Sequence, residues 1–320
     1  MPESRGFSVM KRRSFLRGGM QGLLALGTAK ALHNTVIGYG QFGIGDNLLT
    51  QDLTTIANTG LPSLRGEQTD ISGTAIRVYR GRIRHNQNGQ WRAVNEAVPD
   101  EVQELEGIIM AIQEQDVTYQ FSGVDDFFTF LEGEVTSPVT VALLRQQPAA
   151  DPAILSQFED VDPTKTPELV NALASVFREH TRYDIPRYLA GSIDDNVLPV
   201  DGELRRPFEP TADFETLHEE TDPIGLFCTE YTELAKTAFH AVPADEQSHP
   251  IFSFRVRNAR HKHVYNGIGS VVIRDDRVLL PMTFVDYTDS TLVDDFRVRG
   301  LVGEQIDAYN ENHRADEFHW

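Results

Sequence analysis

The chain reads GLFCTEYTELAKTAFHAV over residues 225–242, and this stretch decides the fold. Its apolar residues recur three and four positions apart, which is typical of a helix with one buried face. Those residues are Tyr231, Leu234, Ala235, Ala238, Phe239 and Val242. The pattern predicts a helix from about Cys228 to His240, so the only cysteine of the 320 residues would lie in its first turn.

The first turn of a helix favours the thiolate form of a cysteine. Unpaired backbone N–H groups and the positive end of the helix dipole stabilise a negative charge there. A single cysteine makes no internal disulfide. Two interpretations of Cys228 therefore stay open, namely a reactive nucleophile and a small apolar residue of the core.

A thiol nucleophile needs a general base and a group that orients the base. His261 and His263 precede a segment that reads as a strand, and Val278–Val285 reads as the returning strand, followed directly by Asp286. A His before one strand and an Asp after its antiparallel neighbour lie at the same end of a hairpin. We therefore expect His263, or alternatively His261, to meet Asp286 near Cys228.

These features resemble the transglutaminase-like superfamily of papain-fold cysteine enzymes, over about residues 164–295. The upstream pattern of a helix over 166–180 followed by Tyr183 is similar to that family as well. In this resemblance Tyr265 takes the place of the usual Trp, and Gly267 that of an acidic residue. The segments that carry it are GLFCTEY at 225–231, HVYN at 263–266 and VDYT at 285–288.

The resemblance implies a fold, an activity and three site residues. The fold is α+β, with the cysteine-bearing helix packed on an antiparallel sheet. The activity is acyl transfer or hydrolysis at an amide of a protein or peptide substrate, with no cofactor and no metal. Cys228 is implied as the nucleophile, His263 as the general base and Asp286 as the orienting carboxylate. Candidate oxyanion donors are the Cys228 backbone N–H, Trp91 and a polar residue of 185–222.

Three other interpretations stay open. One is a catalytically inactive domain of the same fold. Another is an exported binding module, in which the Pro- and acid-rich segment 185–222 holds a partner. The last is a metal site, because His261 and His263 alternate onto one strand face and a carboxylate would complete it. The candidate carboxylates are Asp275, Asp276 and Asp286.

The amino-terminal residues resemble a twin-arginine export signal. Residues 11–17 read KRRSFLR, a glycine-rich and weakly apolar stretch follows, and Ala29-Lys30-Ala31 has the small-x-small form of a cleavage site. The pattern predicts a signal peptide over residues 1–31 and an extracellular or cell-surface protein. No later stretch reaches ~18 consecutive apolar residues, so we expect no membrane span after removal of the signal.

The composition is strongly acidic and poor in lysine. The chain has 48 Asp and Glu against 29 Lys and Arg, a formal net charge of −19, and only five of the cations are lysines. A dense carboxylate surface retains water and counter-ions in concentrated salt, so the composition predicts a halophilic protein. It disfavours nucleic acid as a partner, because phosphate binding needs clustered Lys and Arg and the body of the chain has no long basic run.

The periodicities divide the rest of the chain into four parts. They are a small α+β region (32–146), a linker (147–163), the transglutaminase-like domain (164–300) and a C-terminal tail (301–320). Within the first part we expect a strand over Ala75–Arg84, a tight turn at Asn88-Gly89, a helix opened by Pro99 and a buried strand over Val139–Leu144.

Overall fold

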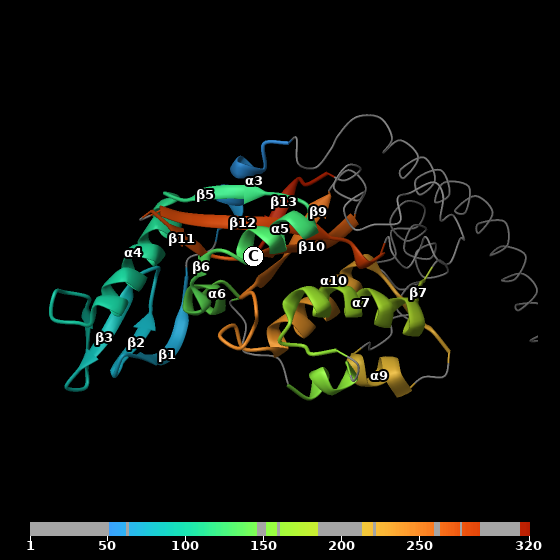
Figure 1. Ribbon diagram of the computed structural model, residues 1–320, viewed down its shortest axis with the longest axis horizontal. Helices are drawn as coiled ribbons and strands as arrows, with labels where there is room; N and C mark the ends of the chain where they lie inside the picture. Colours follow the sequence, from blue (N-terminus) through green and yellow to red (C-terminus); the bar gives the residue numbers. More distant parts are fainter. Residues whose placement is uncertain are drawn as a thin grey trace, which may run out of the picture. The chain divides into compact units, whose positions relative to one another are not determined.

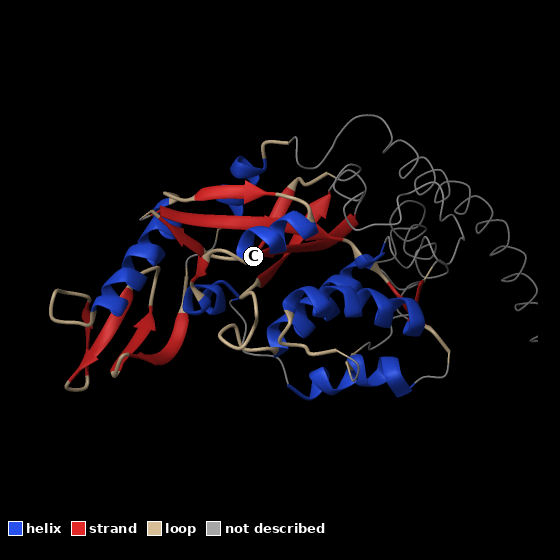
Figure 2. Cartoon of the chain, viewed as in Figure 1, coloured by secondary structure: helices blue, strands red, loops and turns tan. Residues whose placement is uncertain are grey.

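The protein is a mixed α+β structure with mostly antiparallel sheets (Figures 1 and 2). The computed structural model describes residues 51–61, 64–145, 152–158, 161–184, 213–219, 222–258, 263–275, 277–288 and 314–320. The elements discussed below all belong to one compact unit, 45–183 with 212–320. The expected signal peptide, most of the segment 185–222 and His261 lie outside the described residues.

A seven-stranded sheet carries the core, in the order β13-β9-β10-β12-β11-β6 with β5 parallel to β12. The other neighbouring strands pair antiparallel. The strands are β5 (Thr118–Phe121), β6 (Val135–Thr136), β9 (Phe252–Asn258), β10 (His263–Gly269), β11 (Val272–Arg274), β12 (Arg277–Val285) and β13 (Glu317–His319).

Strands β10, β11 and β12 form one long hairpin. Asn266 pairs with Val285 near one end and Arg274 pairs with Arg277 at the other, and every pair between them follows the same register. The Ser270 amide, between β10 and β11, donates to the Pro281 carbonyl oxygen at 3.0 Å, as this register requires. The hairpin is therefore extended without a bulge, and His263 and the residue after Val285 lie at its open end.

Helices cover one face of this sheet. The helix α10 (Cys228–Ala241) packs on β10 and β9 and also contacts α7 (Thr166–His180). A buried apolar cluster joins these helices to the sheet through Phe177, Phe239 and Ile268. The short elements α5 (Val124–Leu131), η3 (Pro152–Gln157) and α9 (Phe214–Glu219) contribute to the same cluster. The predicted helices over 166–180 and 228–240 are confirmed.

A second apolar cluster lies on the other face of the sheet. It contains Phe254, Tyr265 and Phe284 from the sheet, together with residues of a smaller four-stranded sheet and three helices. The strands of the smaller sheet are β1 (Gly66–Ile71), β2 (Thr74–Val78), β3 (Ile83–Gln87) and β4 (Gln90–Ala93). The helices are α3 (Leu53–Gly60), α4 (Asp100–Glu114) and α6 (Pro138–Arg145).

The four-stranded sheet confirms one predicted turn and corrects one predicted strand. Asn88 and Gly89 have φ angles of 54° and 80°, as in the tight turns that favour Asn-Gly. The strand predicted over Ala75–Arg84 is wrong, because a second turn divides it into β2 and β3. Arg80 and Gly81 form that turn with φ angles of 52° and 67°. The helix after Pro99 is confirmed as α4.

The strand predicted over Val139–Leu144 is also wrong, because these residues belong to α6. The β-branched residues of this segment favour strands. Their burial follows a helical spacing instead, since Val141, Leu144 and Arg145 are buried. Pro138 begins the helix, where its missing N–H leaves no hydrogen bond unmade.

The sheet joins parts of the chain that the sequence separates. Strands β5 and β6 come from the region 32–146, yet they pair with β12 and β11. Strand β13 comes from the expected tail and pairs with β9, with Phe318 buried beside Phe254. The described residues before the linker and those after it therefore share one sheet.

Candidate active site

Cys228 is the first residue of α10, as its sequence pattern predicts. The Glu230 carboxylate accepts a hydrogen bond from the Phe227 amide at 2.7 Å, which is one half of a capping box. Phe227 has no side-chain acceptor to complete the other half. Glu230 thus fixes the backbone that enters the helix directly before the thiol, and Cys228 itself is partly exposed.

The segment before Cys228 is held by the end of α7. Strand β7 (Thr181–Tyr183) pairs parallel with β8 (Ile224–Leu226), so Tyr183 lies opposite Leu226. The hydroxyls of Thr181 and Tyr231 form a buried hydrogen bond of 2.8 Å. Strand β7 therefore holds the residues just before Cys228, and Thr181 holds Tyr231 in the first turn of α10.

His263 and Asp286 meet at the open end of the β10–β12 hairpin. His263 Nε2 and Asp286 Oδ2 are 2.5 Å apart, and the side chains are 11% and 1% exposed. The other Asp286 oxygen, Oδ1, accepts a hydrogen bond from the Thr288 amide at 2.8 Å. The carboxylate is thus held from two sides, and it fixes the orientation of the His263 ring.

Cys228 lies within hydrogen-bonding reach of His263 on another side of the ring. Burial is the strongest influence on His263 and acts to lower its pKa. The Asp286 carboxylate, followed by Cys228, acts in the opposite direction and holds the pKa of His263 well above its ordinary value. Because Asp286 occupies Nε2, Nδ1 is the ring nitrogen left for Cys228. The structure thus brings together the three residues that the sequence singled out.

The contacts of Tyr265 and Gly267 explain why these two residue types occupy β10. The Tyr265 ring stacks on His263 with 5.9 Å between ring centroids, and its hydroxyl donates to the Arg314 carbonyl oxygen at 3.0 Å. An added Cβ at Gly267 would lie 2.1 Å from the Phe254 ring. That position therefore accepts no side chain, whereas Tyr265 supplies an aromatic ring beside the imidazole.

A buried polar network joins the cysteine helix to the histidine strand, and no sequence pattern predicts it. Asn266 Nδ2 donates to the Thr232 carbonyl oxygen at 3.0 Å and to Ser253 Oγ at 3.2 Å. The Thr232 hydroxyl donates to the Cys228 carbonyl oxygen at 2.7 Å. Asn266, Thr232 and Ser253 are all at most 2% exposed. The capping role of Glu230, in contrast, has a visible sequence signal, an acidic residue three positions after the N-cap.

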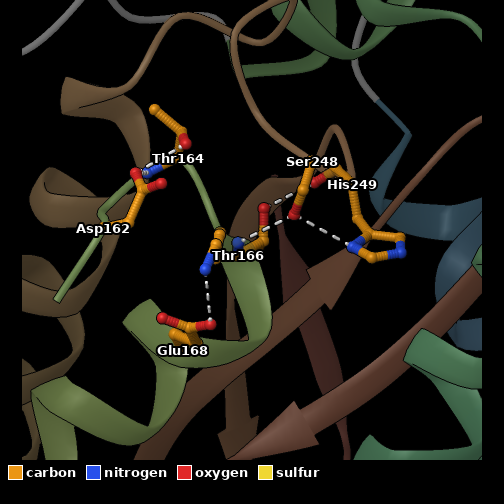
Figure 3. A network of polar contacts seen from close by, with 7 residues as sticks. Asp162, Thr164, Thr166, Glu168, Ser248 and His249 are labelled. Carbon is orange, nitrogen blue, oxygen red and sulfur yellow. Dashed lines mark hydrogen bonds and ion pairs between the residues drawn. The ribbon is translucent and has the colours of Figure 1, made fainter.

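A second polar network surrounds the start of α7 (Figure 3). The Thr166 amide donates to Ser248 Oγ at 3.1 Å, and the Thr166 hydroxyl donates to the His249 carbonyl oxygen at 2.9 Å. Ser248 Oγ also lies 3.1 Å from His249 Nδ1. Ser248 thus caps α7 from a distant loop, because Lys165 at the N-cap position makes no side-chain cap.

Of the other candidates of the sequence, Trp91 and Asp275 are described, and Asp275 lies in the turn between β11 and β12, at the opposite end of the hairpin from His263. Trp91 lies on β4 in the four-stranded sheet, where the Arg77 guanidinium covers its ring. His261 and Asp276 lie outside the described residues. Within the described ranges, no group of three or more His, Cys, Asp or Glu side chains is arranged to hold a metal ion. In the same ranges, no helix combines the length and the apolar character needed to cross a membrane.

Comparison of the chain with protein-family models, curated proteins and solved structures found no match. The geometry of Cys228, His263 and Asp286 is therefore the basis for assigning a function.

Proposed function

We propose that the protein is a thiol-dependent enzyme that transfers or hydrolyses the acyl group of an amide. The observation that carries this proposal is the contact of His263 with Asp286 on one side and its interaction with Cys228 on the other. A nucleophile, a base and an orienting carboxylate in that order form the triad arrangement. The raised pKa of His263 favours an imidazolium, which is the partner that stabilises a cysteine thiolate.

The proposed reaction has two stages. The Cys228 sulfur attacks the amide carbonyl carbon, and His263 donates its proton to the leaving amine as the C–N bond breaks. Water or a second amine then attacks the thioester and gives a proton to His263, and the sulfur leaves as thiolate. Asp286 holds the imidazole in position throughout. The N–H groups of Cys228 and Thr229 have no acceptor within the helix, so they are available to the carbonyl oxygen in the transition state.

Thiol labelling tests the reactivity of Cys228 without knowledge of the substrate. The folded protein is treated with iodoacetamide at mildly acidic pH in high salt, and alkylation is followed by mass spectrometry. We expect fast labelling of the wild type and at least tenfold slower labelling of His263→Gln. The matched control is His319→Gln, which removes an exposed histidine. Equal rates in the wild type and His263→Gln, both as slow as for a core thiol, would favour the inactive interpretation.

Loss of amide turnover in Cys228→Ala tests catalysis directly. Removal of a triad nucleophile lowers kcat by about 10⁴-fold or more. Amine release from a mixed peptide library, detected with fluorescamine, is expected for the wild type and absent in the variant. Unfolding of Cys228→Ala together with no turnover by the wild type would instead place Cys228 in the core.

We further propose that the chain is exported through the twin-arginine route. The support is the KRRSFLR segment at residues 11–17 together with the acidic composition. A fusion of residues 1–45 to a fluorescent reporter, expressed in a halophilic host, is expected outside the cytoplasm. Arg12→Lys with Arg13→Lys should retain it inside, whereas Arg5→Lys serves as the matched control. Export of the double-lysine fusion would refute the proposal.

A further inference from the structure

The four-stranded sheet gathers arginines in a chain that is otherwise acidic. Residues 65–92 contain six arginines and only two carboxylates, Glu67 and Asp70, although the whole chain has a net charge of −19. Two of these arginines occupy directly opposed positions, because Arg77 on β2 pairs with Arg84 on β3. Like charges directly opposite each other destabilise a sheet. The positive charge of this pair therefore needs a neutralising group nearby.

Within the described part of the chain, no carboxylate is in salt-bridge contact with Arg77 or Arg84. Asp70 accepts a hydrogen bond from the Gly73 amide in the β1–β2 turn. Arg82 is the arginine of this sheet that does bind carboxylates, those of Glu106 and Glu114 on α4. As far as the described residues go, the charge of the Arg77–Arg84 pair therefore faces solvent and is available to a bound partner.

The other sheet offers a direct comparison. Arg274 and Arg277 are also opposed across two strands, β11 and β12. There the Glu134 carboxylate binds the Arg274 guanidinium through two nitrogens. Among the described residues, the fold therefore supplies a counter-charge to one cross-strand arginine pair and none to the other.

One aromatic ring contacts Arg77, and a second lies two positions further along the chain. The Arg77 guanidinium lies 4.4 Å from the centroid of the Trp91 ring on β4, and Arg80 lies 5.2 Å from that of Tyr79. Tyr79 is 50% exposed, so its ring is accessible to a partner. Stacked guanidinium groups keep their N–H edges available for bidentate contacts with carboxylates. Exposed rings beside arginines are also enriched where proteins bind other proteins.

We propose that this surface, defined by Arg77, Tyr79, Arg84 and Trp91, binds an acidic polypeptide. Its charge complements Asp- and Glu-rich chains. Strand β4 forms an edge of the sheet, next to Arg84 and Trp91, where an extended chain can add main-chain hydrogen bonds. A single-stranded nucleic acid fits less well, because it binds by stacking bases on open rings, and Arg77 already covers Trp91. The proposal does not depend on the thiol chemistry.

Fluorescence anisotropy with labelled poly-L-glutamate tests this surface on the full-length chain. We expect saturable binding by the wild type that weakens as salt rises. Arg77→Gln with Arg84→Gln should weaken the affinity about tenfold, the effect of two partly exposed ion pairs. Arg274→Gln with Arg277→Gln removes the same charge from the other cross-strand pair and should leave the affinity within about twofold.

Three results would overturn the proposal. The first is no binding of poly-L-glutamate by the wild type at any salt concentration at which circular dichroism shows a folded chain. The second is equal loss of affinity in the two double variants, which would mean that only net charge matters. The third is tighter binding of oligo-deoxythymidine than of poly-L-glutamate of matched charge, which would assign the surface to nucleic acid.

Discussion

The Asn266 side-chain amide bonds the Thr232 main-chain carbonyl at 3.0 Å, and this contact ties the strand of His263 to the helix of Cys228. The pair is buried, and Asn266 also reaches Ser253 on the neighbouring strand β9. The distance between the proposed nucleophile and base thus depends on a residue that takes no part in the chemistry.

Asn266→Ala should therefore impair both stability and the site. It removes one hydrogen bond each from the buried Thr232 carbonyl and the buried Ser253 hydroxyl, and it should lower the free energy of unfolding by about 1–3 kcal/mol. The iodoacetamide reaction of Cys228 should slow in the folded fraction. Asn171→Ala removes an exposed amide that bonds its own helix and should change stability by less than about 0.5 kcal/mol. Unchanged labelling in Asn266→Ala would show that Asn266 has no positioning role.

Asp286→Asn should separate two roles of Asp286, namely holding the His263 ring in position and supplying a negative charge beside it. The amide keeps the shape of the carboxylate but no longer stabilises a positive imidazole, so the pKa of His263 should fall. In the Ser-His-Asp triad the same exchange lowers kcat by ~10⁴-fold, because the amide leaves the geometry intact but stabilises the wrong tautomer of the imidazole. NMR titration of the His263 ring would report the pKa, and thiol labelling would report reactivity. A His263 pKa equal to that of the wild type would contradict the assigned contact.

His263 should also make stability depend on pH. Its pKa in the folded chain is well above the ordinary value of 6.5. The folded state therefore holds the proton more tightly than the unfolded state, and the resulting stabilisation is fully present below about pH 6.5. It is lost as pH rises through the raised pKa. Denaturation midpoints of the wild type and His263→Gln should differ most at mildly acidic pH and converge in alkaline solution. A difference between the two denaturation midpoints that grows as pH rises would contradict this prediction.

Arg145 should be among the most sensitive positions of the fold. Its buried guanidinium donates to the carbonyl oxygens of Val242, directly after α10, and of Ile251, and to Gln247 Oε1, at 2.7–3.0 Å. Burial lowers the pKa of Arg145 to about 10, so it stays charged at neutral pH. Arg145→Met removes all of these buried hydrogen bonds and should cost about 3–5 kcal/mol in chemical denaturation. Arg277→Met, at an exposed arginine, should cost far less stability. Similar losses of stability in the two variants would contradict this role of Arg145.

Ser248→Ala tests the cap of α7 that Figure 3 displays. Loss of an N-cap hydroxyl destabilises a helix by about 1 kcal/mol. The thermal midpoint should fall by a few degrees, since a large domain shifts by roughly 2–4 °C per kcal/mol. Thr59→Ala removes a hydroxyl that bonds back within α3 and is the matched control. Equal midpoints for the two variants would mean that water replaces Ser248 at no cost.

Much of the local structure was predictable, because the spacing of the apolar residues and the residue types at the turns agree with the fold. The apolar spacing of 166–180 and 228–242 predicted two helices, and Asn88-Gly89 predicted a turn. The failures occurred where tertiary contacts override local preference. The β-branched residues Val139–Val141 form a helix because their burial fits that spacing, and Arg80 adopts a positive φ that its residue type rarely shows.

The candidate site was predictable only in part, for a similar reason. Cys228, His263 and Asp286 have chemistry that a sequence displays, and a hairpin places two of them at one end. Asn266 and Arg145 act through main-chain carbonyls of distant segments, and nothing in their own neighbourhood indicates this. The arginine surface was missed because its members are dispersed over separate strands and never form a basic run.

Strand β5 completes one side of β12, although some 160 positions separate them along the chain. The β12 backbone that leads to Asp286 therefore depends on an element made long before it in synthesis. A piece beginning at residue 164 would expose that edge, and exposed edges invite intermolecular pairing. We expect two fragments, cut between residues 146 and 151 and expressed together, to associate and restore the site. The protein is therefore a candidate for a split reporter.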